Sequence, residues 1–204
     1  MHISDSLYRG TGSLTREPFL FYEMRITARL LSQGFSDEDT AARIIAENLY
    51  QYPTERMIKG MVRACLTRLH SLPDYSLVEE IASGNSVFAK QISLYALMLQ
   101  NKLVKDFMIQ VIGEKYRTLD SSFSKSDLNA FFLLISEQDS SIAGWSESTL
   151  RKIKSILVHL LVENQYLDST RSVKLNPILI SPLLEKSIRN SNDTVSLPAF
   201  NCLS

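Results

Sequence analysis

The sequence predicts a mainly α-helical fold, and three observations lead to that expectation. Apolar residues recur every three or four positions along most of the chain before residue 165, which is the period of an amphipathic helix. Serine or threonine precedes several of these segments and can cap a helix there, as at Ser36, Thr54, Ser124 and Ser146. The alternation typical of a β-strand is nearly absent from the same region.

Three helices are expected in the first third of the chain. The first is expected to be capped by Thr15 and to end at Gly34, and Pro53 forces an extended residue before the third. Their predicted ranges are 18–33, 37–50 and 55–69.

The remainder of the chain predicts further helices and then a change of character. The helices are expected at 76–82, 86–100, 103–116, 125–137 and 147–164, with a short segment at 142–144. Residues 166–175 are apolar at both ends and turn-like in the middle, which predicts a small β-hairpin. The tail from Asn190 is polar and is expected to be mobile.

These elements suggest four segments. Residues 1–72 would form an N-terminal helix-turn-helix-like unit and 73–120 a helical middle segment. Residues 121–189 would form a C-terminal winged-helix-like unit, followed by the polar tail 190–204.

Composition narrows the function classes. Of the 204 residues, 45% are apolar, and this fraction is too high for a disordered chain. The 22 basic residues balance 22 acidic ones, which excludes a uniformly basic histone-like protein. Cys65 and Cys202 form neither a disulfide framework nor a zinc-ligand pattern. No apolar stretch approaches the roughly 18 residues of a membrane span, and no secretory signal is visible. A reducing, cytoplasmic setting is expected.

The helix expected over 55–69 carries a basic face. At about 100° per residue its cations fall in one sector, together with a threonine and a glycine that permits close approach. Apolar residues fill the opposite side. As the third helix of a set, it matches the layout of a helix-turn-helix, whose last helix enters the major groove. The residues expected to contact nucleic acid are Arg56, Lys59, Arg63 and Thr67.

The helix expected over 147–164 repeats this layout. Its cations lie opposite an apolar face, and the Ser146 cap leaves first-turn hydroxyls and amides in place to hold a phosphate. The hairpin expected after it resembles the wing of a winged helix. The expected contacts are Ser148, Thr149, Arg151, Lys152 and Ser155 from the helix, and Arg171 and Lys174 from the wing.

Both basic faces have a second interpretation, because every surface helix has a polar side whose cations are often only solvated. No catalytic set is visible either. His2, His70 and His159 lack companions at metal-ligand spacing, and the segment 8–13 lacks the lysine and the preceding strand of a P-loop. We therefore expect a non-catalytic protein with no cofactor and no metal.

Several short motifs stand in a fixed order along the chain. They are Tyr8-Arg-Gly-Thr-Gly, Leu30-Leu-Ser-Gln-Gly, Glu47-Asn48, Tyr95-Ala-Leu, Trp145-Ser-Glu-Ser-Thr and Asn176-Pro-Ile-Leu-Ile-Ser-Pro. Their order and spacing over roughly residues 5–186 resemble the BrxA family of BREX bacteriophage-exclusion systems.

The resemblance implies a mostly helical, cytoplasmic, non-catalytic protein that binds double-stranded DNA. Its partners would include other BREX components such as a methyltransferase and an ATPase. It also implies that part of the fold is similar to the antitermination factor NusB. The contact residues are not implied by the resemblance and rest on the helix angles alone.

We therefore predict a double-stranded DNA-binding accessory protein of a phage-defence system, with largely sequence-independent binding and a monomer favoured. The alternative is a protein–protein scaffold within the defence complex. In that case the basic faces would dock acidic partners, and Leu183-Leu184 with the tail would order on assembly. A metal-dependent nuclease is the third hypothesis, which incubating plasmid with the protein and magnesium or manganese would test.

Overall fold

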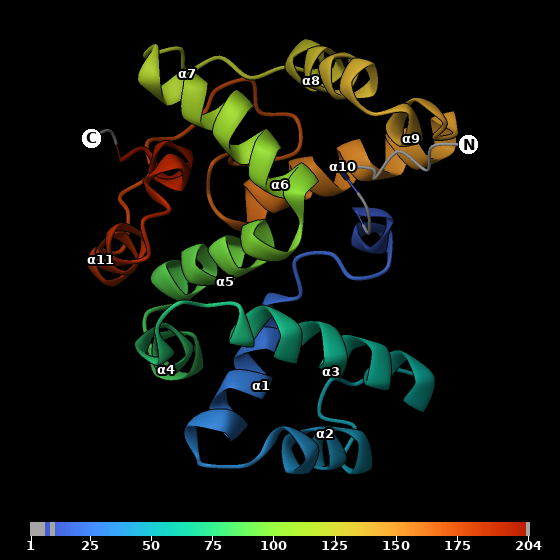
Figure 1. Ribbon diagram of the computed structural model, residues 1–204, viewed down its shortest axis with the longest axis vertical. Coiled ribbons are helices and arrows are strands. Elements are labelled where there is room, and N and C mark those ends of the chain that lie inside the picture. The colour runs from blue at the N-terminus through green and yellow to red at the C-terminus, as the bar shows by residue number, and fades with distance from the viewer. Residues whose placement is uncertain (1–6, 9–10, 203–204) are drawn as a thin grey trace. The chain divides into compact units, whose positions relative to one another are not determined.

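The computed structural model describes residues 7–8 and 11–202, and it is mainly helical as predicted (Figure 1). Its contacts divide the chain into two compact units. Unit 1 comprises the residues up to Pro18, Asn101–Leu179 and the residues from Asp193 onward, and unit 2 comprises Phe19–Gln100 and Ile180–Asn192. The four segments expected from the sequence and the similarity to NusB stay predictions.

Unit 2 is built from six helices among the described residues. They are α1 (Phe21–Ser32), α2 (Asp37–Ala46), α3 (Glu55–His70), α4 (Tyr75–Ser83), α5 (Ser86–Gln100) and α11 (Pro182–Asn190). Helix α3 packs on α1, α2 and α5, and α4 packs on α1 and α5. The side chain of Gln91 on α5 accepts a hydrogen bond of 2.8 Å from the backbone of Ser181, which fixes the start of α11.

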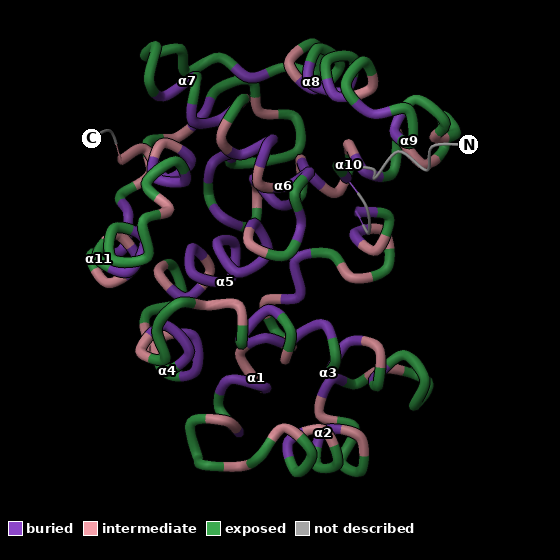
Figure 2. The backbone as a smooth tube through the Cα atoms, viewed as in Figure 1, coloured by how far each residue is buried: buried purple, intermediate pink, exposed green. Residues whose placement is uncertain are grey.

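Helix α5 forms much of the core of unit 2. Its residues Gln91–Met98 are all buried, and Figure 2 shows it purple along most of its length. A helix that is apolar all round must be buried on all sides, because no face of it is suited to water. Leu184 of α11 is also fully buried. The expectation that Leu183-Leu184 is left to order on assembly is therefore wrong.

The beginning of the first helix differs from the prediction. Residues Thr11–Thr15 form a separate 3₁₀ helix, η1, and α1 begins only at Phe21 after Leu20 in a left-handed conformation. The Thr15 hydroxyl donates to the carbonyl of Gly12 at 3.0 Å, and Leu20 occupies the cap position of α1 without a side-chain cap bond. The end is as predicted, because Gly34 adopts a φ of 89° that closes the helix.

The connection from α2 to α3 is longer than a tight helix-turn-helix turn. Helix α2 ends at Ala46 and not near Tyr50, because Asn48 takes a positive φ and its side chain bonds both backbone polar groups of Tyr52. These two bonds, at 3.0 and 3.1 Å, hold the turn closed. Thr54 then caps α3 by accepting from the backbone of Met57, as the sequence predicts.

Unit 1 contains the remaining elements. They are η1, α6 (Lys102–Phe107), the π-helical turn η2 (Met108–Gly113), α7 (Glu114–Arg117), α8 (Lys125–Gln138), α9 (Ser140–Ala143), α10 (Glu147–Glu163) and the 3₁₀ helix η3 (Thr194–Phe200). Asn101 caps α6, Ser124 forms a capping box with Asp127, and Ser146 caps α10. The starts of α8 and α10 therefore match the expectation.

The predicted β-hairpin is not confirmed. Residues 166–175 form a turn-rich loop that Asn176 closes. Its backbone donates to the carbonyl of Tyr166 at 2.9 Å, and its side chain donates to the carbonyl of Gln165 and to Asp168. The pairing of this loop goes elsewhere, because an isolated antiparallel bridge joins Ser122 to Lys174. Neighbouring backbone bonds, Phe123 to Val173 and Leu175 to Ser121, flank that bridge. Among the described residues this is the one β-bridge, so the loop is tied to the segment before α8 and is not a two-stranded wing.

The C-terminal residues differ from the expected mobile tail. Helix η3 buries Leu197 and Phe200, and it packs on η2 and α7. A Cβ on Gly113 would lie 2.9 Å from the side chain of Pro198, so only glycine admits this approach. Tyr166 donates a buried hydrogen bond of 2.9 Å to the carbonyl of Ala199. The sequence pattern of the tail is polar overall, yet Leu197, Ala199 and Phe200 are buried, whereas Val195 is exposed.

The tyrosine of the Tyr8 motif has a structural role. Its hydroxyl donates to Asp106 at 2.8 Å, and its carbonyl accepts from both the backbone and the hydroxyl of Thr11. Lys102 pairs with the same Asp106 and lies 5.3 Å from the tyrosine ring centre. Arg9 and Gly10 lie outside the described residues. These contacts anchor Tyr8 and Thr11 within unit 1.

Candidate nucleic-acid interface

Helix α10 presents the basic face that the sequence predicts. The Ser146 side chain accepts from the backbone of Thr149 at 3.2 Å and fixes the start of the helix. Ile153, Leu157 and Leu161 on its inner side are fully buried. Because side chains on a helix repeat every 3.6 residues, this burial turns the opposite face toward solvent. The polar residues left exposed on that face are Ser148, Arg151, Lys152, Ser155 and His159.

The two cations of this face have no carboxylate partner among the described residues. Arg151 makes only a long contact of 3.4 Å from Nε to the carbonyl of Glu147. Lys152 has no hydrogen-bond or carboxylate partner within the described part of the chain. An exposed guanidinium and ammonium without a counter-charge attract anions.

The hydroxyls of the first turn are already engaged. The Ser146 hydroxyl lies 2.9 Å from the hydroxyls of both Ser148 and Thr149. Thr149 is half-buried and its amide is occupied by the cap, whereas Ser148 is exposed. Ser148 is therefore better placed than Thr149 to reach a phosphate, because a hydroxyl can donate to one partner and accept from another.

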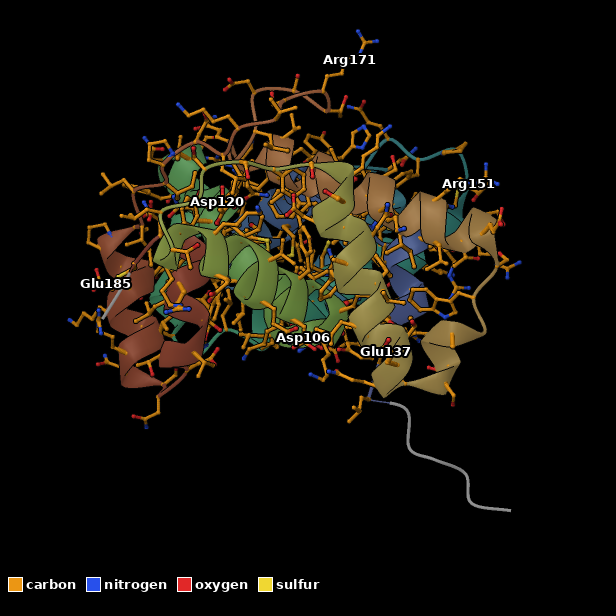
Figure 3. The ribbon with its side chains drawn as sticks, turned by 90° about the horizontal axis from the view of Figure 1, so that it is seen from above. Asp106, Asp120, Glu137, Arg151, Arg171 and Glu185 are labelled. Carbon is orange, nitrogen blue, oxygen red and sulfur yellow. The ribbon has the colours of Figure 1, made fainter. Side chains whose placement is uncertain are left out.

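Two further predicted contacts lie in the loop after α10. Arg171 is exposed at the tip of the loop and points away from the ribbon, as Figure 3 shows. Lys174 is exposed next to the bridge with Ser122. The backbones of Ser169 and Ser172 bond each other's residues and form a tight turn that contains Arg171. The loop thus carries both cations on an ordered backbone, although it is not the predicted hairpin.

Helix α3 of unit 2 carries the second basic face. Its inner residues Ile58, Val62 and Cys65 are buried, and burial raises the pKa of the Cys65 thiol to about 12, so this thiol stays protonated and unreactive. The four predicted contact residues are all exposed, and they are Arg56, Lys59, Arg63 and Thr67.

The charges of the α3 face are only partly available. Lys59 forms an ion pair with Glu55 one turn earlier, and the Thr67 hydroxyl donates to the carbonyl of Arg63. Arg68, a further cation of this helix, is 5% exposed and donates to the carbonyl of Phe19, so it serves the fold. Arg56 and Arg63 are therefore the cations that this face offers without a counter-charge among the described residues.

Sequence analysis missed a basic pocket in unit 1. It has a volume of about 370 Å³ and lies between α8, α10 and the loop after α10. Lys154 lines it and donates to the side chain of Asn129 at 2.7 Å. At about 100° per residue, Lys154 falls at the edge of the apolar face of α10. The angles alone therefore place it outside the basic face. The signal that was available is the pair Lys125 and Asn129, four residues apart on α8.

An ion cluster around the buried Lys115 fixes the start of α8. Lys115 contacts Asp120 at 2.9 Å and Asp127 at 3.0 Å, and its side chain is 11% exposed. Hydrogen bonds from Ser122 and Lys115 hold the pKa of Asp120 well below its usual range. Burial of Asp127 opposes its ionisation, but the bonds from Lys115 and Ser124 outweigh that effect and lower its pKa as well.

Replacing Lys115→Met is expected to lower the free energy of unfolding by about 2 kcal/mol, because the partly buried Asp127 loses its counter-charge. The exposed Asp120 adds little, since solvent screens its pairing with Lys115. Urea denaturation at neutral pH measures the loss, with Lys186→Met, an exposed lysine of α11, as the matched control. The depressed pKa values of Asp120 and Asp127 stabilise the fold above about pH 4, and this contribution is lost as the pH falls through the folded values. The variant should therefore lose less stability on acidification than the parent. Equal stability of parent and Lys115→Met would contradict this role.

The described residues contain neither a cluster of metal ligands nor a membrane-spanning helix. Within residues 7–8 and 11–202, no group of three His, Cys, Asp or Glu side chains is arranged to hold a metal ion. No helix among these residues has both the length and the apolar content to cross a membrane.

Comparison with known proteins shows the family. The family model described as BrxA matches residues 9–192. A protein named BREX protein BrxA from Bacillus cereus (strain H3081.97) is 32% identical over 182 residues, which are 89% of this chain and 88% of the relative. Another protein of this name, from Escherichia coli O9:H4 (strain HS), is 27% identical over 84% of this chain and 80% of its own length.

A solved structure shares the fold. The crystal structure of an uncharacterized protein from Magnetospirillum magneticum aligns with a TM-score of 0.77 over 93% of this chain and 96% of that one, at 20% identity. At that identity the likeness concerns the fold alone. The match of the family model over nearly the whole chain, together with the relative from Bacillus cereus, settles the assignment: the chain belongs to the BrxA family.

Proposed function

We propose that this chain is a non-catalytic accessory protein of a BREX phage-defence system and that it binds double-stranded DNA. The observation that supports DNA binding best is the exposed face of α10. There Arg151 and Lys152 stand next to each other without a carboxylate partner among the described residues. Phosphate oxygens of DNA are the abundant anions that such a face accepts.

The contacts divide between the two units. In unit 1, Arg151 and Lys152 would reach phosphates, and Ser148 would donate to a phosphate at the start of α10. Arg171 and Lys174 would add contacts from the loop after α10. Thr149 and Ser155 would lie at the margins of the face. In unit 2, Arg56 and Arg63 would provide the main charge, with Lys59 and Thr67 next to them. Neither face carries the asparagine or glutamine that commonly reads adenine. Binding should therefore depend little on sequence.

Fluorescence anisotropy of labelled 30-base-pair duplexes tests the proposal. Two duplexes of unrelated sequence should bind saturably and with affinities that agree within about threefold, because phosphate contacts carry no sequence information. Absence of binding to either duplex at low salt would overturn the proposal.

The scaffold hypothesis remains the second candidate, and one observation favours it. Leu133 and Leu134 of α8 are 64% and 45% exposed, which is unusual for adjacent leucines and suits contact with another protein. Co-purification with the other BREX components distinguishes the two candidates. Association that persists after nuclease treatment supports the scaffold, whereas association that nuclease abolishes supports binding through DNA.

A further inference from the structure

The basic pocket of unit 1 gathers three cations in one place. Lys125 comes from α8, and Arg151 and Lys154 come from α10. No carboxylate lines the pocket, and none of the three cations forms an ion pair within the described part of the chain. Three like charges around one cavity repel each other, and a bound anion relieves that repulsion.

One of the three cations, Lys154, is held in a defined position. The Lys154 ammonium donates to the Asn129 side chain at 2.7 Å and lies 5.3 Å from the centre of the Phe132 ring. An ammonium has three hydrogens, so two stay available for a ligand after the bond to Asn129. Its stem is half-buried, which limits the rotamers that it can adopt. A ligand would therefore meet a cation that needs little reorganisation.

The pocket also has an apolar side, and it is larger than a small inorganic anion. Leu128 is 3% exposed and Val158 is half-buried, and both line the cavity. The volume of about 370 Å³ lies in the range of small-molecule sites. A phosphate ion alone would fill only a part of it, and it would leave the apolar side without a contact.

From this combination we propose that the pocket binds one nucleotide unit. The phosphate would lie between Lys125, Arg151 and Lys154, and the sugar or base would lie against Leu128 and Val158. The nucleotide can come from two sources, a free nucleoside monophosphate or the terminal nucleotide of a DNA strand. Only the second source rests on the proposed function. The pocket and the exposed face of α10 share Arg151, Ser155 and His159.

Titration of the full chain with deoxyadenosine 5′-monophosphate (dAMP) tests the pocket directly. Amide resonances of residues 151–159 should shift saturably in NMR spectra. Inorganic phosphate and deoxyadenosine serve as separate probes for the charged and the apolar half. We expect dAMP to bind about tenfold or more tightly than either half, because it uses both. Equal affinity for dAMP and phosphate, or no binding of dAMP, would overturn the proposal.

Two variants remove different parts of the pocket. Lys154→Met removes the held cation and should weaken dAMP binding about tenfold, while Val158→Trp fills the cavity and should abolish it. Lys186→Met on α11 is the matched control and should bind dAMP as the parent does. Thermal unfolding shows which variants are folded. If Val158→Trp does not fold, Lys154→Met alone tests the pocket. Unchanged dAMP binding in folded Lys154→Met would contradict the site.

The source of the nucleotide follows from paired duplexes with and without a 5′-phosphate. Tighter binding of the phosphorylated duplex that disappears in Lys154→Met assigns the site to DNA ends. If dAMP binds but the duplexes with and without a 5′-phosphate bind equally well, the pocket is a site for free nucleotides. Duplex binding without dAMP binding means that the pocket proposal fails while the proposed function stands. Conversely, dAMP binding without duplex binding means that the proposed function fails while the pocket stands.

Discussion

Reversing the charge of Arg151 and Lys152 to glutamate is expected to weaken duplex binding about 100-fold, which corresponds to about 2.7 kcal/mol. Each substitution removes a cation from the α10 face and places a carboxylate next to the phosphate backbone, so attraction becomes repulsion. Both side chains are exposed, and neither forms an ion pair within the described residues, so the fold should be unaffected. Anisotropy with a labelled duplex at about 0.1 M salt measures the change.

The control for this variant carries the same net charge at another place. Arg117→Glu with Lys186→Glu changes two exposed cations outside both basic faces and should reduce affinity severalfold at most. Arg117 pairs with Glu114 on the surface, and loss of such a solvent-screened pair has little effect on stability. If the two double variants lose equal affinity, the net charge of the chain governs binding and the α10 face has no special part.

The charge-reversed triple Arg56→Glu, Lys59→Glu, Arg63→Glu is expected to weaken duplex binding about 30-fold. The loss per residue is smaller than on α10, because Lys59 already pairs with Glu55. The dependence of affinity on salt should also become shallower, by about 2 in log–log slope, since Arg56 and Arg63 no longer displace counterions. The same anisotropy titration, repeated at several salt concentrations, measures both effects.

The matched control for the triple is Arg117→Glu, Lys186→Glu, Arg189→Glu, in which the net charge falls by the same amount. It should retain most of the affinity and the salt slope of the parent. Unchanged binding by the α3 triple would remove α3 from the interface without affecting the prediction for α10. A loss of folded structure in the triple would show instead that the exposed face of α3 is needed for stability.

Local sequence patterns were sufficient for the helices that carry the candidate site. The caps Thr54 and Ser146 begin α3 and α10 where predicted, and the apolar period turns the cations of both helices to the surface. These features depend on residues within one or two turns of each other, so one sequence contains the needed information.

Features that depend on contacts between distant segments were not predictable in this way. The loop after α10 pairs at Lys174 with Ser122, more than 50 positions earlier, and so no hairpin forms. The tail is held by the approach of Pro198 to Gly113 and by the bond from Tyr166 to Ala199. The basic pocket likewise needs α8 and α10 side by side, and Lys154 gains its partner Asn129 only then.

Binding of a labelled, arbitrary 30-base-pair duplex across a salt series tests the central claim most directly. If the unpaired cations of the basic faces neutralise phosphates, the logarithm of the association constant should fall linearly with the logarithm of the salt concentration. The slope should be about −3.6 if only the four cations of α10 and its loop neutralise phosphates, and about −5.4 if Arg56 and Arg63 of α3 do so as well. Absence of binding at low salt, or an affinity that salt leaves unchanged, would contradict an electrostatic DNA interface on this protein.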